Sequence, residues 1–229
     1  HSCAVLTDGK IKCWGANYFG QLGDGTSANK NFPADVSNFG SEAKMISTGE
    51  YHTCAITASN GVKCWGNNSS GQLGDNSNTT NNIPVDVHNI ESVNHSVYTG
   101  GDHSCSLTAS GGVNCWGENS SGQLGDGTTV GKSTPVAVVG VNNAANMVST
   151  GVYHTCAVTT NNGVKCWGSN GYGQLGNGER TIRITPVDVL GLGEGVNSVS
   201  AGLSHTCALT LNGGVECWGS NFYGQLGDG

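Results

Sequence analysis

The stretch HTCAITASNGVKCWGNNSSGQLGD, from His52 to Asp75, combines a histidine, two cysteines ten residues apart, a Trp-Gly pair and a glycine-rich turn. The same pattern begins again at His1, His103, His154 and His205. Each step is 51 residues long, the tryptophans and prolines keep the same step, and no insertion interrupts it. Such a strict period indicates a repeat protein in which every unit contacts its neighbours in the same way.

Each unit contains four short apolar runs. In the second unit they are FPADV, KMIS, HTCAIT and GVKCWG, which span residues 32–36, 44–47, 52–57 and 61–66. Each run has the length of a strand and is followed by glycine, asparagine or serine, and none keeps a helical period. Four antiparallel strands in a unit of about 40 to 50 residues are typical of a β-propeller blade.

The predicted fold is therefore an all-β propeller of four-stranded antiparallel blades. In this division the chain opens with a half-blade at residues 1–25, and four full repeats follow at 26–76, 77–127, 128–178 and 179–229. The last repeat brings no strand that would complete the half-blade. We therefore expect a fragment of a larger ring or array that does not close alone.

Composition argues against several functions. The net charge is −7, and the nine lysines and arginines are scattered, whereas nucleic-acid binding needs a basic surface. No run approaches the roughly 18 apolar residues of a membrane helix. The phosphate-loop and nucleophile-elbow motifs are absent. We predict a non-enzymatic protein with no cofactor, no metal, no nucleic-acid partner and no membrane span.

Two stretches resemble the regulator of chromosome condensation (RCC) repeat family. ISTGEYHTCAIT at 46–57 and VSAGLSHTCALT at 199–210 are similar to the family signature, and the pattern WGxNxxGQLGxG follows it. The resemblance covers essentially the whole chain. It implies a β-propeller, usually of seven blades. Bacterial and surface relatives with plain repeats like these act mostly as binding scaffolds.

The founding eukaryotic member of that family exchanges guanine nucleotide on a small GTPase and docks on nucleosomes. This sequence departs from it, because its loops contain no long insertion that could serve as a wedge and it has no basic tail. The resemblance therefore carries the fold, and the nuclear function does not follow from it.

The ten cysteines form one pair per unit. If Cys54 faces Cys64 in a hairpin, then Ile56 faces Val62 and all four side chains share one face of the sheet. Directly opposed residues are close enough for a disulfide. Free thiols, metal ligation and bridges between blades are the alternatives, although metal sites usually show closer spacing. The predicted pairs are Cys3 with Cys13, Cys54 with Cys64, Cys105 with Cys115, Cys156 with Cys166, and Cys207 with Cys217.

Five disulfides indicate an oxidising compartment, so we predict an extracellular or cell-surface location.

Residues that recur in every unit are expected to hold the unit together. The histidines are predicted to be buried and to bond a backbone group across the blade. The tryptophans are predicted to pack between adjacent blades. The aspartates of the GQLGDG turns, such as Asp75, are predicted to be turn residues, because one carboxylate per turn is too few for calcium.

Specificity is expected where the units differ. The pair that follows the WGxN asparagine is Ser69-Ser70 in the second unit and Ser120-Ser121 in the third, but it contains aromatic residues in the others. The predicted binding rim consists of Tyr18, Phe19, Tyr172, Phe222 and Tyr223. The alternative, equally well supported by the sequence, is that these side chains cover the next blade. The loops that read NSNTTNN, GTTVGKST and GERTIRIT also vary.

Five sequons occur, at Asn67, Asn68, Asn78, Asn94 and Asn119. Asn68 and Asn119 align with asparagines that lack a sequon in other units, which indicates a turn role. Asn78 and Asn94 are the predicted glycosylation sites.

The leading hypothesis is an extracellular, non-enzymatic scaffold that binds a protein or glycan through its rim loops. The second is a structural subunit that polymerises with itself into a surface filament or coat, which the perfect period and the incomplete ring favour. The third is a guanine-nucleotide exchange factor, which would require reduced cysteines.

Overall fold

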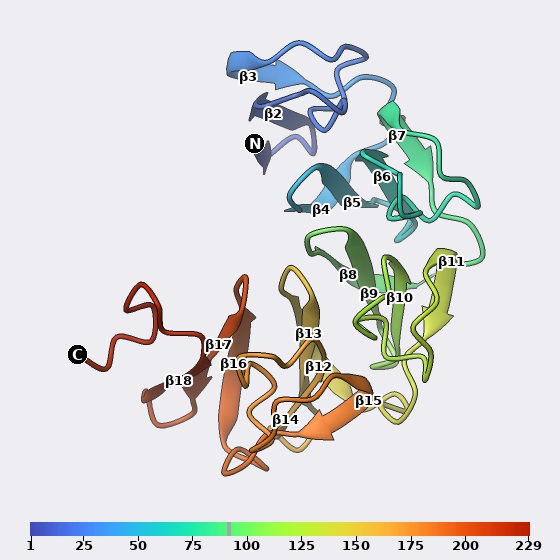
Figure 1. Cartoon of the computed structure of the whole chain (residues 1–229). Coiled ribbons are helices and arrows are strands. Elements are labelled where there is room, and N and C mark those ends of the chain that lie inside the picture. The colour runs from blue at the N-terminus through green and yellow to red at the C-terminus, as the bar shows by residue number, and fades with distance from the viewer. Residues whose placement is uncertain (91–92) are drawn as a thin grey trace.

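A computed structural model describes residues 1–90 and 93–229, and every regular element in them is a strand. The strands form five antiparallel sheets. The sheets follow one another along an open arc, and both termini lie on its open side (Figure 1). The predicted all-β propeller architecture of antiparallel blades is confirmed. No helix that could span a membrane occurs among these residues.

Each complete sheet runs in chain order from an inner strand to an outer strand. The second sheet contains β4 (Ala43–Thr48), β5 (His52–Thr57), β6 (Val62–Gly66) and β7 (Asn81–Asp86). The third contains β8 (Asn94–Thr99), β9 (His103–Thr108), β10 (Val113–Gly117) and β11 (Lys132–Ala137). The fourth contains β12 (Ala145–Thr150), β13 (His154–Thr159), β14 (Val164–Gly168) and β15 (Arg183–Asp188).

The two terminal sheets have three strands each. The first contains β1 (Ser2–Val5), β2 (Ile11–Gly15) and β3 (Lys30–Asp35). The fifth contains β16 (Val196–Ala201), β17 (His205–Thr210) and β18 (Val215–Gly219).

The sheets are one strand out of phase with the predicted repeats. The strand expected to open repeat 26–76 instead pairs as β3 with the preceding strand β2, with Ala34 opposite Cys13. The division into a half-blade and four full blades was therefore wrong in its phase: three four-stranded sheets lie between two three-stranded ones. Pro33 has no N–H to donate, which suits a strand at the edge of a sheet. Both phases place it at an edge, and its pairing with β2 instead of β4 decides between them.

The core lies between neighbouring sheets. Trp65 of the second sheet is fully buried and packs with Ile11 and Leu22 of the first sheet. Trp116 and Trp167 belong to the equivalent clusters one and two sheets further on. The predicted position of the tryptophans between adjacent blades is confirmed, and these contacts bury large apolar area in a chain with few apolar residues.

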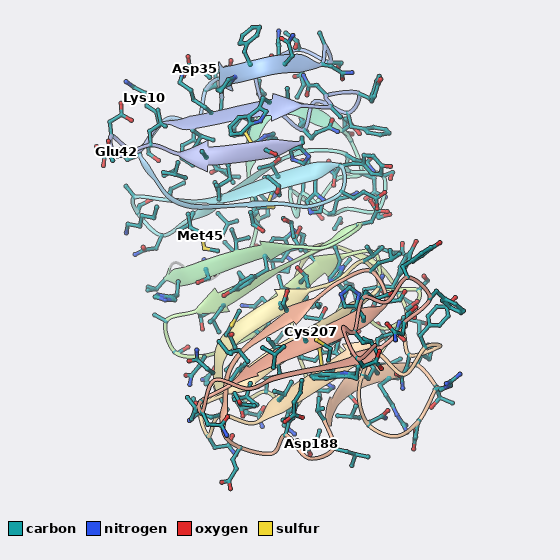
Figure 2. All side chains as sticks on the ribbon, turned by 90° about the vertical axis from the view of Figure 1, so that its left-hand side faces the viewer. Lys10, Asp35, Glu42, Met45, Asp188 and Cys207 are labelled. Carbon is teal, nitrogen blue, oxygen red and sulfur yellow. A yellow bond between two sulfur atoms is a disulfide. The ribbon has the colours of Figure 1, made fainter. Side chains whose placement is uncertain are left out.

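A disulfide closes the central hairpin of every sheet. Cys54 lies opposite Cys64 and Ile56 opposite Val62, as the sequence predicts. All five predicted pairs are bonded, with Cα–Cα distances of 4.1 Å. Figure 2 shows the sulfur of Cys207 within its sheet.

Candidate binding surface

The variable residues lie together on one face of the arc, which we call the loop face. Because the strands of a sheet are antiparallel, the loop between β4 and β5 and the loop between β6 and β7 emerge at the same end. The other sheets repeat this arrangement. The loop face therefore consists of loops 49–51 and 67–80 and their equivalents at 51-residue steps.

A buried asparagine fixes each long loop of this face. The Asn68 side-chain nitrogen donates to Asp75 Oδ1 at 3.1 Å and to the carbonyls of Ser77 and Thr79 at 3.2 and 3.1 Å. Its oxygen accepts from the N–H of Leu73 at 2.9 Å. Asn17 and Asn119 make the same bonds in their sheets. The predicted turn role of these aspartates is confirmed, and the loop is held rigidly by its own side chains.

A chain of hydrogen bonds links each sheet to the next below this face. His52 Nε2 lies 2.8 Å from Ser104 Oγ, which donates to the carbonyl of Gln72 at 2.9 Å. The same carbonyl accepts from Trp116 Nε1 at 2.9 Å. Because the hydroxyl has one proton and gives it to the carbonyl, His52 Nε2 must donate to the hydroxyl. The expectation of a backbone partner for the histidine was wrong, because a side-chain hydroxyl of the next sheet stands between the ring and the backbone.

His52, His103 and His154 are neutral structural groups. Burial lowers the pKa of His52 and His103 to about 3, and that of His154 to about 4. A neighbouring histidine lowers each pKa further. Among the described residues, no cluster of histidine, cysteine, aspartate or glutamate is arranged to hold a metal ion.

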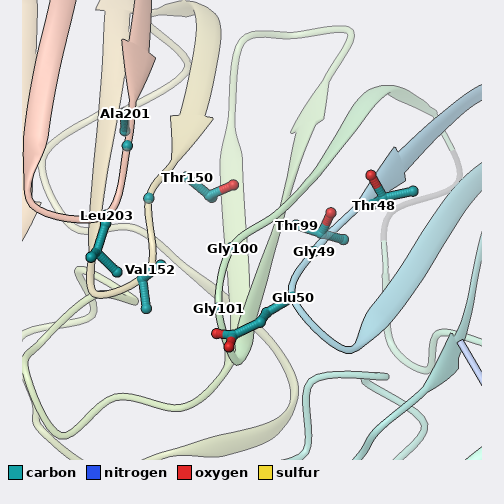
Figure 3. A pocket seen from close by; sticks show the side chains of 12 residues that line it. Thr48, Gly49, Glu50, Thr99, Gly100, Gly101, Thr150, Val152, Ala201 and Leu203 are labelled. Carbon is teal, nitrogen blue, oxygen red and sulfur yellow. The ribbon is translucent and has the colours of Figure 1, made fainter. Parts of the chain in front are cut away.

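A hollow of about 320 Å³ lies on the loop face where the inner strands end (Figure 3). It is lined by three consecutive residues from each of four sheets. These are Thr48, Gly49 and Glu50, then Thr99, Gly100 and Gly101, then Thr150, Gly151 and Val152, and finally Ala201, Gly202 and Leu203.

The glycines in this hollow allow the sheets to approach one another. A Cβ atom on Gly100 would lie 2.4 Å from the carbonyl oxygen of Gly151 and 2.5 Å from Cε1 of His103. The hollow is therefore bordered by packed backbone, and Glu50 is the one charged side chain among the described residues that line it.

Aromatic side chains lie on the loop face at both ends of the arc. Phe19 packs edge-to-face with Tyr51 of the next sheet, with ring centroids 5.2 Å apart. Tyr172 packs in the same way with Phe222 of the next sheet at 5.6 Å. Each pair bridges two sheets, and three of the four rings, those of Phe19, Tyr172 and Phe222, belong to the predicted rim. The exposed fraction is 72% for Tyr18, 77% for Phe222 and 95% for Tyr223.

Two aromatic residues of this face did not emerge from the sequence. Tyr51 and Tyr153 are 38% and 48% exposed, and each precedes the first histidine of its hairpin. The units differ at this position too, since Asp102 and Ser204 occupy it in the other sheets. This difference between units is the signal in the sequence that marks the two tyrosines.

A small pocket of about 270 Å³ adjoins the second aromatic pair. Tyr172, Phe222 and Arg180 line it together with the backbone of the loop that follows β18. Arg180 belongs to the variable stretch GERTIRIT and is exposed. The pocket therefore combines two exposed rings with a guanidinium group. The guanidinium can pair with a carboxylate, and the rings can pack against an aromatic or apolar side chain.

The middle of the loop face is acidic instead of aromatic. Asp102 occupies the position of Tyr51 one sheet further on and accepts from Gln72 Nε2 at 2.8 Å. Its burial, together with the nearby carboxylates of Glu50 and Glu118, raises the pKa of Asp102. The loop face thus has two aromatic ends separated by a region with serine pairs and carboxylates.

The sequons differ in accessibility. Asn78 is exposed in its loop. Asn94 is 2% exposed within β8, and its side-chain nitrogen donates to the carbonyl of Asn60 at 3.3 Å. Asn94 is therefore inaccessible to a glycosylating enzyme in the folded chain, and its assignment was wrong because the sequence did not reveal that it begins a buried inner strand. Asn68 and Asn119 are fully buried, in agreement with their turn role.

Taken together, the open arc, the cystine-bridged blades and the inter-sheet hydrogen bonds define a repeat-built β-propeller. The RCC1-like domain family matches residues 1–229, so the chain belongs to that family, as the sequence motifs indicate.

Three known proteins are similar to it. The ultraviolet-B receptor UVR8 of Arabidopsis thaliana is 31% identical over 234 residues, which cover 100% of this chain and 53% of UVR8. Human WBSCR16 is 27% identical, with a TM-score of 0.83 over 94% of this chain and 58% of that one. Yeast RCC1 (Prp20), crystallised with Kap60, is 19% identical with a TM-score of 0.83, over 96% of this chain and 54% of that one. The chain spans about half the length of each.

Proposed function

We propose that the chain is a non-enzymatic scaffold that binds a partner protein through its loop face. The observation that carries the proposal is the pair of aromatic clusters at the two ends of that face. Tyrosine, phenylalanine and arginine are enriched in the cores of protein interfaces, where rigid rings fill pockets at low entropic cost. The rigid loops beneath these rings support a preformed surface.

The pocket beside Tyr172 and Phe222 is proposed as the centre of the contact. Two rings that bridge neighbouring sheets, with Arg180 beside them, offer a site for an acidic or aromatic side chain of the partner. The family membership supports a binding scaffold, because similar propellers occur in proteins as different as the ultraviolet-B receptor UVR8 and yeast RCC1, which was crystallised bound to Kap60.

The test uses the serine pairs that the chain itself carries. Tyr172→Ser with Phe222→Ser, and separately Tyr18→Ser with Phe19→Ser, place serine where the second and third sheets already have it, so folding should be retained. We expect affinity for a protein partner, measured by surface plasmon resonance, to fall roughly tenfold or more for at least one double variant. Ser69→Ala with Ser70→Ala is the matched control at the same loop position.

If the native chain binds to a glycan array and the serine variants do not, the partner is a glycan instead of a protein. Equal affinities of both serine variants and the native chain for every ligand would rule out the rim as the binding surface.

We also propose an extracellular or cell-surface location and an N-glycan at Asn78. The five disulfides support the location, because such bonds persist in oxidising compartments. Peptide mapping of the native protein without reductant should recover five cystine-linked peptides, and a modified peptide containing Asn78. Ten free thiols would contradict the location.

A structural subunit of a filament or coat is the second candidate. It is favoured by the unbroken 51-residue period, which gives every sheet the same contact with its neighbour. Electron microscopy of the native material separates the two functions: regular polymers would support the filament, and isolated particles would support the binder.

A further inference from the structure

Negative charge is concentrated in the middle of the loop face. The loops of the second and third sheets on this face contain five carboxylates and neither lysine nor arginine. These loops span residues 49–51, 67–80, 100–102 and 118–131, and their acidic residues are Glu50, Asp75, Asp102, Glu118 and Asp126. Both sheets lie between other sheets of the arc (Figure 1). The charge therefore belongs to the interior of the arc and not to either of its ends.

The cations of the chain do not neutralise Glu50, Asp102 and Glu118. Seven of the nine lysines and arginines form ion pairs with other acidic residues. The eighth, Lys44, donates to a side-chain amide oxygen at 2.7 Å, and the ninth, Arg180, lies in a loop of the fourth sheet. Among the described residues, these three carboxylates are therefore left without a counter-ion.

The three carboxylates meet at the boundary between the second and third sheets. The N–H of Glu50 donates to the carbonyl of Gly100 at 3.3 Å, and the Glu50 side chain extends toward Gly101 (Figure 3). The N–H of Glu118 donates to the carbonyl of Asp102 at 2.9 Å. Burial and the nearby carboxylates of Glu50 and Glu118 raise the pKa of Asp102, as expected where like charges lie together without a cation.

Neutral donors hold two of these side chains in place. Gln72 Nε2 donates to Asp102 Oδ1 at 2.8 Å, and the N–H of Ser120 donates to Glu118 Oε1 at 2.8 Å. A neutral donor fixes the position of a carboxylate without removing its charge. The negative charge is therefore preorganised and remains available to a cationic ligand.

An amide without a partner points toward the same carboxylates. Gln123 is fully buried, and its Nε2 has no hydrogen-bond partner among the described residues. In the next sheet, the equivalent Gln174 Nε2 lies 3.4 Å from Oγ of Ser169, which corresponds to Glu118. The Gln123 amide is thus directed at position 118, where the carboxylate is turned to Ser120. Three acceptors without a cation and one donor without an acceptor suit a peptide, which supplies a basic side chain together with carbonyl oxygens.

The aromatic pair of Phe19 and Tyr51 borders this site. Tyr51 directly follows Glu50, and its ring remains 38% exposed beside that of Phe19. Asn67 joins the ring to the carboxylates, because its N–H donates to the carbonyl of Tyr51 at 2.9 Å and its Nδ2 donates to Asp102 Oδ1 at 3.5 Å. A ring beside carboxylates suits a side chain with an apolar stem and a cationic end, which is lysine or arginine.

We propose that the boundary between the second and third sheets is a receptor site on the loop face for a lysine or arginine side chain of an extended segment of the partner protein. The inference rests on the proposed function and specifies the chemistry of the partner. The cation lies among the carboxylates of Glu50, Asp102 and Glu118, and the stem packs along the ring of Tyr51. The same charges repel an acidic segment or a nucleic-acid backbone.

The probe is a library of random peptides of about 12 residues displayed on phage and selected on the whole chain. We expect lysine or arginine to be enriched about threefold over the unselected library at one position of the selected sequences. A selected peptide and its copy with glutamine in place of the basic residue should differ about tenfold in Kd by fluorescence anisotropy.

Two charge variants place the preference on the structure. Glu50→Gln with Glu118→Gln removes two charges and leaves Asp102 to hold Gln72, so the chain should fold and bind the two peptides equally. Glu42→Gln with Glu194→Gln is the matched control. It makes the same charge change in exposed loops that precede inner strands, on the face opposite to the loop face, and should keep the preference for the basic peptide.

Selected peptides without an enriched basic residue, an unchanged preference in the Glu50→Gln with Glu118→Gln variant, or no selected peptide would each overturn the inference. The Tyr18→Ser with Phe19→Ser variant separates this result from the proposed function. Peptides that lack a basic residue and bind the native chain but not this variant would support the aromatic rim and overturn the receptor site. A basic preference that all the serine variants retain would support the receptor site and argue against the rim.

Discussion

Single residues in this chain act by linking one sheet to the next. His52, Ser104, Gln72 and Trp116 form one continuous chain of hydrogen bonds across a sheet boundary. The sequence contains a signal for it, because a serine or threonine follows the histidine in every unit. The expected partner was nevertheless a backbone group, because a hydrogen bond between neighbouring sheets depends on their spacing, which periodicity alone does not provide.

The buried histidines predict that acid destabilises the fold. The pKa of each is lowered from 6.5, to about 3 for His52 and His103 and about 4 for His154, so the unfolded chain binds more protons between those limits. The free energy of unfolding should therefore fall as the pH drops from about 6.5 toward 4, by about 1.4 kcal/mol per pH unit for each histidine.

Urea denaturation at a series of pH values measures this slope. His103→Gln keeps a side-chain donor but removes one titrating group, so its slope should be smaller by about one histidine. An identical slope in the variant would show that other groups cause the acid sensitivity.

The glycines that line the hollow on the loop face predict a steric effect. Gly100→Ala places a methyl group 2.4 Å from the carbonyl oxygen of Gly151, so the sheets must separate, and we expect a loss of about 2 to 3 kcal/mol in unfolding free energy. Gly193→Ala is the matched control, because a Cβ atom there has no neighbour within 4 Å. Thermal or urea denaturation of both variants measures the difference, and equal stability would contradict the close approach.

At the scale of the element, the hairpin was the most predictable part of the molecule. The ten-residue spacing of Cys54 and Cys64 and the alternation of apolar residues fix one register, and the structure has that register. The grouping of hairpins into sheets was less predictable. Either neighbour of the hairpin gives a unit of four strands, and only the paired edges show that the proline strand closes the preceding sheet.

The disulfides predict the stability of each hairpin. Cys105→Ala with Cys115→Ala should lower the free energy of unfolding by about 2 to 3 kcal/mol, because the unfolded chain regains the freedom of a short closed loop. Denaturation with and without dithiothreitol measures the effect. The native chain should lose more stability than the variant when the reductant is added, and a chain indifferent to reductant would contradict the structural role of the bridges.

At the scale of the whole molecule, the fifth sheet differs from the interior sheets. All six residues of β5, β9 and β13 are buried, whereas β17 is buried at Thr206 and Ala208 alone. Its outward face has no neighbouring sheet among the described residues. The period predicted this repetition of contacts, but it could not show how unequal the burial of the five units would be.

This inequality predicts a gradient of local stability when residues 1–229 are studied as an isolated chain. Amides of β17 should exchange faster than those of β13 by at least tenfold, because few buried contacts resist local opening there. Hydrogen exchange followed by mass spectrometry of peptides from 205–210 and 154–159 measures the ratio. Uniform protection in all five sheets would indicate that the face of the fifth sheet is covered in solution.

The hydrogen-bond chain between sheets has a consequence for how such a molecule can change length. Each link joins a histidine to a hydroxyl 52 residues later, so duplication of one whole unit supplies a new donor and a new acceptor in matching positions. An insertion of one residue within one of the paired strands would turn the side chains that follow it in that strand to the other face. Gain or loss of complete units therefore keeps every one of these links between sheets.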